Sequence, residues 1–524
     1  MSAKIYSLGA GATLAALVAA GFILLRLWFF PLLPIDETRY LSVAWEMWQN
    51  HNWLVPQLNG EPYAHKPPLL FWLINVNWLC FGVTDFTSRV VIPVVGLSSF
   101  FLLSSIVNNF FANAARIAAL APMMLLSFLP WLVYSPLTMF DVLVCVCLLA
   151  SLYCMLKYGQ EQTTGWLLAA GLAVGAGLLA KGPVMLVFWL PLVLSHHFWK
   201  PAPDLCSKTW VKAALLATLL GILVVLLWAI PAAIFGGETY AEAILWRQTT
   251  GRIANAFAHA RPWYWYLLLL PLLLLPWSLT GIWRGAWAKT PLQRFALWGM
   301  LPQLLLFSLM SGKQVHYLIP LLPFAALWMA CKWPDIRPRY YGMVALLLVI
   351  ALSLVVLPEV TAHYFPGASL SPWVRALSLL PLALALLLTT RPNTRWLLLA
   401  FPLALQSLLL GISPVIRHYY DLQVFAREVI GVQEQGKPIA YVDDYADQFR
   451  FLARGTQALT ELRTEHDIER WIEQHPEGYL VLEHKAPGGD LARYAQLAMP
   501  YRNGEYLLIR NSRWQEMEVK TALF

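Results

Sequence analysis

Residues 213–235 read AALLATLLGILVVLLWAIPAAIF and contain no charged side chain. A run of about 18 or more apolar residues is long enough to cross the hydrocarbon core of a bilayer as a helix. Hydrocarbon offers no hydrogen-bond partner, so the backbone must satisfy its own polar groups, and a helix does this. The stretch therefore predicts a membrane-spanning helix.

Similar apolar runs recur from the N-terminus to about residue 415. The chain has 524 residues, of which 59% are hydrophobic and 13% charged, and its mean hydropathy is +0.58. Soluble domains carry about a quarter charged residues, which excludes one large soluble enzyme. We expect an all-α polytopic membrane domain over residues 1–415, with about thirteen spans. The expected spans are 6–30, 89–111, 114–133, 140–157, 165–180, 183–199, 213–235, 263–283, 295–311, 314–331, 340–358, 373–389 and 396–414.

The positions of Lys and Arg predict the direction of the spans. With the N-terminus in the cytoplasm, and the first run kept as an anchor and not cleaved as a signal peptide, every second loop should be basic. The predicted cytoplasmic turns contain Arg116, Lys157, Lys200, Lys208, Lys212, Arg284, Lys289, Arg294, Lys332, Arg337, Arg339, Arg391 and Arg395. This bias explains the net charge of +8, so nucleic-acid binding is not expected. Segments 34–88 and 236–262 and the C-terminal tail then lie on the outer, extracytoplasmic face of the membrane.

The tail at residues 420–524 has a more polar composition. The predicted strands are 438–442, 478–483 and 506–510, and the predicted helices are 445–452, 465–474 and 491–497. This pattern indicates a small periplasmic α/β domain. It contains no glycine-rich phosphate-binding motif, so a nucleotide is not expected there. The six cysteines of the chain form no CxxC pair, and no disulfide framework is predicted.

The first outer segment carries charged residues beside the membrane, where charges are costly and usually functional. It reads PIDETRY and then NWLVPQLNGEPYAHKPPLLFWL, and its candidate site residues are Asp36, Glu37, Arg39, Tyr63 and Lys66. Residues 39–50 and 69–79 show amphipathic patterns typical of helices that lie on a membrane surface. Taken alone, Asp36 is better explained as a helix N-cap.

Further polar residues lie at other outer ends of the spans. They are Asp141, Lys181, Arg247, Arg252, His259, Arg261, Lys313, His316 and Tyr317. Any single cation can be explained by a long side chain that reaches the interface. Because the positive-inside rule disfavours Lys and Arg on this side, their accumulation indicates an anionic ligand.

A lipid phosphate fits this set of residues. Lys and Arg form charge-assisted hydrogen bonds with phosphate oxygens, and they would stabilise the charge that develops on a leaving phosphate. A nearby carboxylate could take a proton from an attacking acceptor. Nucleotide sugars are not supplied outside the cytoplasm, so a lipid-linked sugar is the expected donor.

The segment DETRY…NWLVPQLNGEPYAHKPPLLFW resembles the first periplasmic loop of aminoarabinose transferases and protein O-mannosyltransferases. These are GT-C glycosyltransferases that use polyprenyl-phosphate sugars. The later stretches LAKGP, RPWYWY and SGKQVHYLIPLLP resemble further motifs of the bacterial branch, and the likeness covers residues from about 30 to about 330. It implies an inverting transfer from an undecaprenyl-phosphate sugar to an extracytoplasmic acceptor, which would be a lipid A-like lipid, a glycan or a protein.

The resemblance also implies roles for individual residues. Asp36 would be the catalytic base, and Glu37 would assist or position it. The implied contacts of the donor phosphate are Arg39, Lys66, Tyr317, Lys313 and Arg252. The remaining site candidates are Tyr63, Asp141, Lys181, His259, Arg261 and His316.

A structural zinc ion is a further implication of the resemblance. In aminoarabinose transferases the residue before the motif lysine is commonly Glu, and it can help bind zinc with a histidine of a later loop. Here that position is His65, and His259 is its candidate partner. A histidine pair can ligate zinc. No cofactor is expected to be required, because the family is described as working without a catalytic metal.

Two other functions compete with the transferase. A transporter or flippase for the same kind of lipid would place polar groups near the midplane, on broken helices within repeats. The charges here gather at outer helix ends and no repeat is visible, which favours the enzyme. A scaffold that only presents the tail domain would leave the DETRY and KPP segments without a role.

Overall fold

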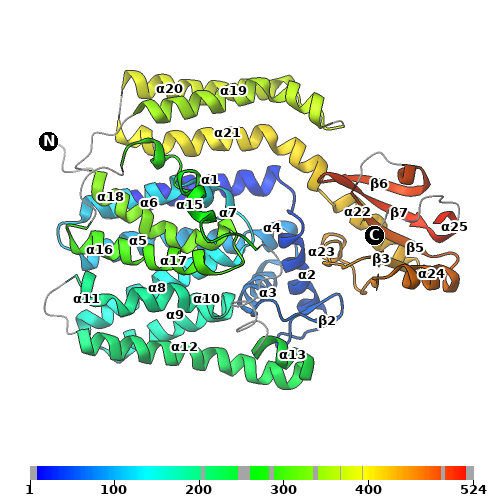
Figure 1. The fold of residues 1–524 in the computed structure, drawn as a ribbon, viewed down its shortest axis with the longest axis horizontal. Helices are drawn as coiled ribbons and strands as arrows, with labels where there is room; N and C mark the ends of the chain where they lie inside the picture. The colour runs from blue at the N-terminus through cyan, green and yellow to red at the C-terminus, as the bar shows by residue number, and fades with distance from the viewer. Residues whose placement is uncertain are drawn as a thin grey trace. The chain divides into compact units, whose positions relative to one another are not determined.

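The computed structural model describes residues 9–201, 207–245, 260–282, 288–333, 340–365, 367–391, 393–485 and 490–514. These residues form two compact units (Figure 1). The membrane unit contains the described residues up to Trp28 together with Ala64–Pro358 and Ser371–Gly411. The tail unit contains Phe29–Tyr63, Glu359–Leu370 and the described residues from Ile412 onward.

The membrane unit is built from helices. Those lying wholly or mostly in it are α1 (Ala10–Phe29), α3 (Leu69–Phe81), α4 (Asp85–Arg89), α5 (Val91–Phe110), α6 (Ala115–Ser127), α7 (Leu129–Tyr134), α8 (Phe140–Glu161), α9 (Thr164–Lys181), α10 (Val184–Leu194), α11 (His196–Trp199), α12 (Ser207–Gly236), α13 (Glu238–Glu242), α15 (Trp265–Leu273), η2 (Trp277–Leu279), α16 (Pro291–Trp298), α17 (Leu301–Leu309), η3 (Val315–Leu321), α18 (Leu322–Lys332), α19 (Tyr340–Tyr364), η5 (Pro372–Ser378), α20 (Leu379–Thr390) and α21 (Thr394–Tyr420).

Nine helical stretches of the described residues are long and apolar enough to cross a membrane, and α3, α6 and α10 are shorter apolar helices. The prediction of a polytopic all-helical membrane domain is confirmed. The total of about thirteen spans stays a prediction.

Several predicted spans are interrupted at prolines. The run 114–133 divides into α6 and α7 at Phe128, and Pro130 stands in the first turn of α7. The run 263–283 divides into α15 and η2 around Pro276. Proline has no N–H to donate and its ring clashes with the preceding turn, so a continuous apolar run does not guarantee a continuous helix.

Glycines bring α9 and α12 into close contact. A Cβ atom added to Gly171 would lie 2.6 Å from Cβ of Leu220, and one added to Gly175 would lie 2.7 Å from Cβ of Val224. Gly221 on α12 faces Val174 in the same way, at 2.7 Å. Small residues allow helix backbones to approach closely where lipid provides little driving force for association.

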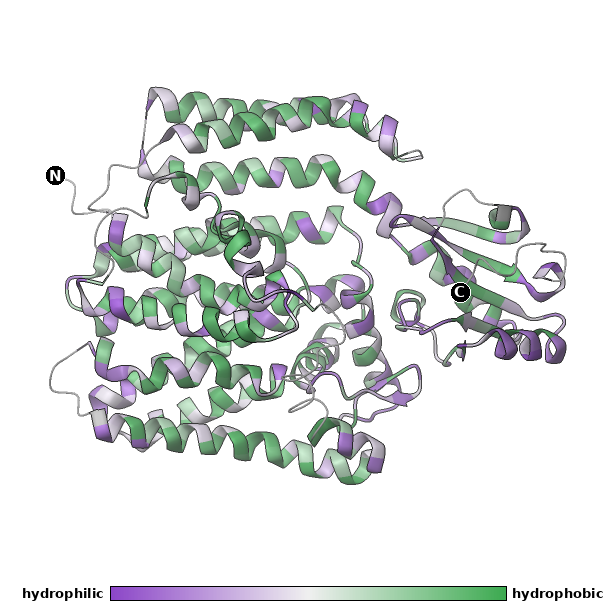
Figure 2. Cartoon of the chain, viewed as in Figure 1, coloured by the Kyte–Doolittle hydropathy of each residue, from purple (hydrophilic) through white to green (hydrophobic). Residues whose placement is uncertain are grey.

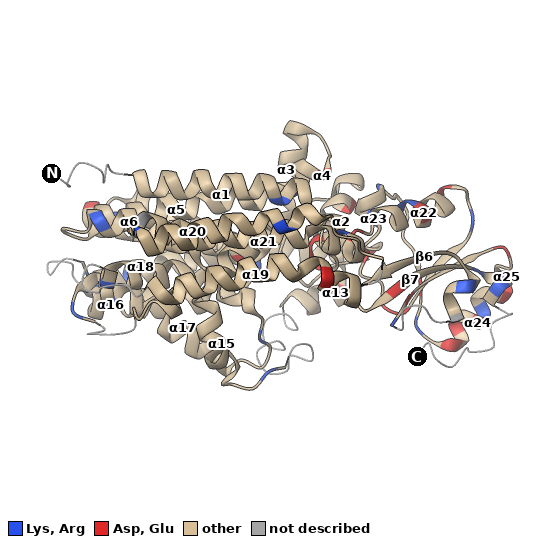
Figure 3. Cartoon of the chain, turned by 90° about the horizontal axis from the view of Figure 1, so that it is seen from above, with Lys and Arg blue, Asp and Glu red and all other residues tan. Residues whose placement is uncertain are grey.

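Hydrophobic residues predominate along the long helices of the membrane unit (Figure 2). Lys, Arg, Asp and Glu gather near the helix ends and are sparse along the middle of α1, α19 and α20 (Figure 3). This distribution matches a bilayer solvent, in which a charged side chain at the centre is costly.

The tail unit begins with α2 (Asp36–Gln49) and a short hairpin of β1 (Gln57–Leu58) and β2 (Glu61–Pro62). Its later elements are α22 (Gln423–Glu434), β3 (Ile439–Val442), α23 (Arg450–Ala453), β4 (Thr460–Leu462), α24 (Glu465–Gln474), β5 (Tyr479–His484), η6 (Asp490–Tyr494), β6 (Ala495–Tyr501), β7 (Gly504–Arg510) and α25 (Asn511–Trp514). The sheet order is β4-β3-β5-β7-β6. Strand β3 is parallel to β4 and β5, whereas β7 is antiparallel to β5 and β6.

Alternate side chains of the sheet form two different cores. Leu480 and Leu507 pack with Ile468 and Ile472 of α24 in an aliphatic core. The other core is made of aromatic rings from α22, from the residue before α23 and from the strands. Phe425 and Phe449 both contact the ring of Tyr506. Phe449 also contacts Tyr441, and Tyr501 lies against Tyr506. Successive side chains of a strand point to opposite faces, which explains the division. The small α/β domain predicted for the tail is thus present.

Part of the tail prediction is wrong in detail. The helix predicted over residues 491–497 is present only in its first half, where Asp490–Tyr494 form the short 3-10 helix η6. Ala495–Tyr501 form β6, which pairs with β7 across a turn at Arg502 and Asn503. The sequence AQLAMPY has little strand propensity of its own, and pairing with a neighbouring strand overrides it. Of the helices predicted over 465–474 and 445–452, the first is α24, whereas the second is reduced to the short α23, which begins at Arg450 and ends one residue beyond the predicted range.

The two compact units divide the chain differently from the predicted domains. We assigned segment 34–88 to the membrane domain, but residues 29–63 group with the C-terminal residues. The physical reason is a set of buried polar contacts between α2, the β1–β2 hairpin and the segment around α23. Such contacts between residues about 400 positions apart cannot be read from local sequence patterns.

Candidate active site

The tail unit holds the acidic start of α2. Ile35 occupies the N-cap position, so Asp36 is the first helical residue and not the cap. Residues three and four positions apart share one face of a helix, which brings Arg39 and Tyr40 to Asp36. Arg39 Nη2 lies 2.6 Å from Asp36 Oδ1, and the Tyr40 hydroxyl donates to the same oxygen at 3.3 Å.

Asp36 remains accessible in this arrangement, since 48% of its side chain is exposed. The positive end of the helix dipole favours a negative charge at this position. Burial, and then the charge of Asp36, raises the pKa of Tyr40 well above its ordinary value, so Tyr40 stays protonated as a donor. The result is an accessible carboxylate whose orientation is set by two neighbouring donors.

Glu37 and Tyr63 are buried beside this carboxylate. Glu37 is 2% exposed, and its Oε2 accepts a hydrogen bond from Leu33 N–H at 3.0 Å. Tyr63 is buried, its N–H donates to the Pro56 carbonyl at 2.7 Å, and its hydroxyl lies near enough to Arg39 to interact electrostatically. The contacts of Glu37 fix the chain that enters α2, which is a positioning role.

The membrane unit holds a buried ion pair. Helices α8 and α9 are joined by two residues, so the start of α8 and the end of α9 lie at the same end of the hairpin. Asp141 is in the first turn of α8 and Lys181 is the last residue of α9. Lys181 Nζ donates to Asp141 Oδ1 at 2.5 Å, and the two side chains are 7% and 4% exposed. Both charges suit the dipole at their helix end.

Two residues of η3 complete this cluster. His316 Nε2 lies 3.9 Å from Asp141 Oδ2, and the ring of Tyr317 lies 4.2 Å from Lys181 Nζ, within cation–π range. The ring of Tyr134, at the end of α7, lies 5.6 Å from that of His316. Asp141 of α8, Lys181 of α9 and the two η3 residues His316 and Tyr317 therefore meet in the membrane unit, with Tyr134 of α7 beside His316.

Lys313 has mainly backbone partners. It is 2% exposed, and its ammonium donates to the carbonyl of Arg261 at 2.9 Å and to that of Met310. Arg261 itself is exposed, with its guanidinium 5.8 Å from the ring of Trp265. The Lys313 contacts hold two loops of the membrane unit together. They also use N–H donors of the Lys313 ammonium that a bound phosphate would need.

Of the remaining predicted site residues, the structure describes some and not others. Lys66 is half-buried, and its Nζ lies 5.6 Å from the ring of Phe140, next to Asp141 in the chain. His65 is exposed. Arg252 and His259 lie outside the described residues, as does Arg247. In the described part of the chain, no three His, Cys, Asp or Glu side chains are grouped as metal ligands would be.

Sequence reasoning missed three contributors. Tyr40 stands four positions after Asp36, and that helical spacing was the available signal. Tyr134 ends an apolar helix, and nothing in its local sequence indicated a contact with His316. Arg450, in the stretch DQFRFLA, is a cation among apolar residues, and it pairs with Glu46 of α2.

The two clusters differ in what they can do chemically. The Asp36 cluster offers an accessible carboxylate that can accept a proton, next to a guanidinium that can bind an anion. In the membrane unit, Asp141 and Lys181 neutralise each other, while Tyr317 and the nearby Lys66 provide a hydroxyl and an ammonium. Both are found at predicted outer ends of helices.

Comparisons with known proteins identify relatives of this chain. The family described as dolichyl-phosphate-mannose-protein mannosyltransferase matches residues 65–228. An undecaprenyl phosphate-alpha-4-amino-4-deoxy-L-arabinose arabinosyl transferase of Sodalis glossinidius is 30% identical over 407 residues, which are 72% of this chain and 71% of that protein. The enzyme of the same name from Pseudomonas aeruginosa strain UCBPP-PA14 is 32% identical over 56% of this chain and 54% of its own length.

A solved structure has the same fold. The crystal structure of ArnT from Cupriavidus metallidurans bound to undecaprenyl phosphate superimposes with a TM-score of 0.71 and 18% sequence identity. The superposition covers 99% of this chain and all of that chain. The shared fold therefore includes residues of both units. The sequence identity to this solved structure is lower than the identity to the two arabinosyl transferases above.

Proposed function

Because this chain belongs to the aminoarabinose transferase-like family of GT-C glycosyltransferases, we propose that it transfers a sugar from an undecaprenyl-phosphate donor to an acceptor at the outer face of the bacterial inner membrane. The chain is a multi-span membrane glycosyltransferase, and none of the comparisons supports a flippase. The observation that carries the proposed chemistry is the accessible Asp36 carboxylate, oriented by Arg39 and Tyr40.

Asp36 acts as the general base in this proposal. It takes the proton from a hydroxyl or phosphate group of the acceptor while that oxygen attacks the anomeric carbon of the sugar. The bond from that carbon to the phosphate oxygen breaks, undecaprenyl phosphate leaves, and the configuration at the carbon inverts. General bases contribute factors of about 10²–10⁴ to such rates. Glu37 supports the base by fixing the chain before α2.

Cations and a tyrosine hold the donor phosphate. Arg39 and Lys66 provide charge-assisted donors, and the hydroxyl of Tyr317 provides a neutral one. The ring of Tyr317 rests on Lys181, so the Asp141–Lys181 pair supports Tyr317 and need not touch the donor. Lys313 and the undescribed Arg252 are weaker candidates, since the Lys313 ammonium is engaged by two carbonyls.

The reaction in this form needs no cofactor. A structural zinc ion at His65 with His259 stays a prediction, because zinc sites use three or four protein ligands and His65 is the one candidate of the pair within the described residues. The acceptor is a lipid A-like lipid, a glycan or a protein. The active site and the tail unit are proposed to be periplasmic, from the alternation of basic loops.

The testing experiment is sugar transfer by the purified full chain in detergent, with a panel of undecaprenyl-phosphate sugars as donors and lipid A as acceptor. Asp36→Asn is compared with Asp85→Asn, since both aspartates are the first residue of a helix. Transfer that is lost in Asp36→Asn and kept in Asp85→Asn supports the proposal. Near-normal turnover by folded Asp36→Asn refutes the base, and lipid flipping without transfer by the wild type refutes the enzyme.

A further inference from the structure

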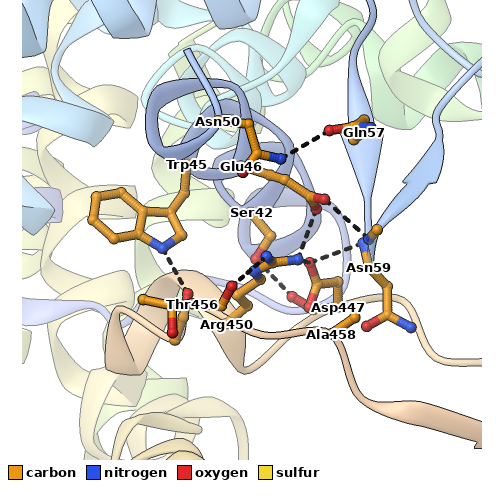
Figure 4. A network of polar contacts seen from close by, with 12 residues as sticks. Ser42, Trp45, Glu46, Asn50, Gln57, Asn59, Asp447, Arg450, Thr456 and Ala458 are labelled. Atoms are coloured by element: carbon orange, nitrogen blue, oxygen red, sulfur yellow. Dashed lines mark hydrogen bonds and ion pairs between the residues drawn. The ribbon is translucent and has the colours of Figure 1, made fainter. Parts of the chain in front are cut away.

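The tail unit contains a buried polar network that the proposed chemistry does not use (Figure 4). At its centre, Arg450 Nη1 donates to Glu46 Oε2 at 2.7 Å and lies 3.8 Å from Asp447 Oδ2. The Glu46 and Asp447 side chains are 1% exposed and that of Arg450 is 5% exposed. One cation is therefore shared by two buried carboxylates.

The network joins α2 to residues near α23. Ser42 Oγ donates to the Asp447 carbonyl at 2.6 Å and accepts from Phe451 N–H at 3.2 Å. Trp45 Nε1 donates to the Gly455 carbonyl at 2.9 Å. Together with Glu46, these contacts occupy more than one turn of the same face of α2, so they oppose both rotation and sliding of the helix.

The β1–β2 hairpin is tied into the same network. Its turn residue Gly60 donates its N–H to Glu46 Oε1 at 3.0 Å. The side chain of Asn59 donates to the Leu459 carbonyl at 2.9 Å and accepts from Leu459 N–H at 2.8 Å. Glu46 thus has both carboxylate oxygens occupied, one by Arg450 and one by the hairpin.

A buried network of this kind is a poor source of stability by itself. The desolvation of two carboxylates and a guanidinium offsets most of the attraction between them, and well-packed apolar residues often serve stability as well. What such a network provides is a single allowed arrangement, because any other leaves buried charges unpaired. Asp36 stands ten residues before Glu46 on the same helix, about 15 Å along its axis at 1.5 Å per residue.

We propose that Arg450 is a positioning residue for the transfer reaction, which holds α2 through Glu46 and so fixes the place of Asp36 and Arg39. This rests on the proposed function, and it gives the C-terminal residues a role in the reaction without any contact with the substrate. Loss of the anchor frees α2, and misplacement of a catalytic group by about 1 Å can cost a factor of about 10² in rate.

The test uses the full chain in detergent, with Arg450→Ala, Arg450→Lys and, as a matched control, Arg470→Ala. Arg470 is an exposed arginine of α24 in the same unit, with a contact to His466. Transfer is measured as kcat and donor KM well below the melting temperature. Hydrogen exchange is measured in α2 and in α8 (Phe140–Glu161).

We expect Arg450→Ala to speed exchange in α2 at least tenfold, to leave exchange in α8 unchanged, and to lower kcat by about tenfold to a hundredfold with donor KM within threefold of wild type. Arg450→Lys keeps the charge and should restore part of both losses, and it stands in if Arg450→Ala does not fold. Arg470→Ala should match the wild type.

Unchanged exchange in α2, or faster exchange with unchanged kcat, overturns the proposal. An equal rise of exchange in α2 and α8 also overturns it, because that result reports general destabilisation. A wild-type chain that transfers no sugar refutes the proposed function instead, and the exchange data still decide whether Arg450 orders α2.

Discussion

Asp36 and Asp141 occupy similar local positions but opposite environments. Each lies in the first turn of a helix and each has a cation within 2.6 Å. The side chain of Asp36 is 48% exposed, whereas that of Asp141 is 4% exposed and has Lys181 and His316 around it. An accessible carboxylate can exchange protons with a substrate, and an enclosed one with a bound ammonium serves the architecture. Residue type and helix position therefore do not distinguish the accessible aspartate from the enclosed one.

The strongest way to sharpen this comparison is to neutralise Asp36. Asp36→Asn should lower kcat by about 10²–10⁴-fold, since it removes the proton acceptor. The melting temperature should stay near that of the wild type, because the lost ion pair is partly exposed and such pairs contribute little. Parallel measurement of turnover and thermal unfolding checks both parts. A fall of both quantities together would place Asp36 with Asp141 as an architectural residue.

The opposite signature is expected for Asp141. Asp141→Asn leaves the Lys181 ammonium buried without its charge partner, which should cost about 3–5 kcal/mol of stability. Replacing both residues by leucine should cost less than the single change, because no unpaired charge remains. Thermal unfolding in detergent tests this, with Lys157→Ala as the control, since its pair with Glu161 is on α8 but exposed. A melting temperature of Asp141→Asn equal to that of wild type would contradict the assignment.

Asp447 extends the comparison to a third aspartate. Burial raises its pKa to about 7, with Arg450 opposing and Glu46 adding to the rise. Between pH of about 4 and about 7 the folded chain holds a proton that the unfolded chain has released, so stability should fall as pH rises through this window. Each tenfold change in proton affinity corresponds to about 1.4 kcal/mol.

The measurement for Asp447 is the melting temperature at pH 5 and pH 8. Wild type should be less stable at pH 8, and Asp447→Asn should reduce this difference because it removes the titrating group. The control is Asp444→Asn. Asp444 is an exposed aspartate that lies three positions before Asp447 and forms an ion pair with Arg463. An equal pH effect in all three chains would mean that Asp447 stays ionised throughout.

The smallest expected effect concerns the orientation of Asp36. Tyr40→Phe removes one hydrogen bond of 3.3 Å to Oδ1 and keeps the ring. A hydrogen bond to a charged group contributes about 1.5–3 kcal/mol at most, and the long contact indicates the low end. We expect kcat to fall about tenfold with little change in donor KM. A kcat equal to that of wild type would leave Arg39 as the main partner that orients Asp36.

Much of this protein could be predicted from local patterns. Apolar runs such as 213–235 predict membrane helices, and their basic loops predict direction, because the bilayer excludes charge and unpaired backbone groups. The spacing of Asp36, Arg39 and Tyr40 places them on one helical face. Asp141 and Lys181 were also named from their places at helix ends, and the two-residue connection of α8 and α9 explains why they meet.

Other features depended on contacts between distant parts of the chain. Glu46 and Arg450 are 404 positions apart, and neither has a local pattern that names the other. The strand β6 forms only because β7 offers it a partner, against the preference of Ala, Gln, Leu and Met. The assignment of residues 29–63 to the tail unit follows from the same kind of long-range pairing.

The amino-acid sequence by itself determined that most of this protein lies in a membrane, that this larger part is helical, and which charged groups stand at its helix ends. Hydrophobicity, charge and helical spacing act over a few residues, so a local sequence is enough to show them. Only the tertiary structure decided which of those groups are open and which are closed. Exposure of Asp36, enclosure of Asp141 and capture of Glu46 by Arg450 all follow from packing, which sets the local dielectric and therefore what each charge can do.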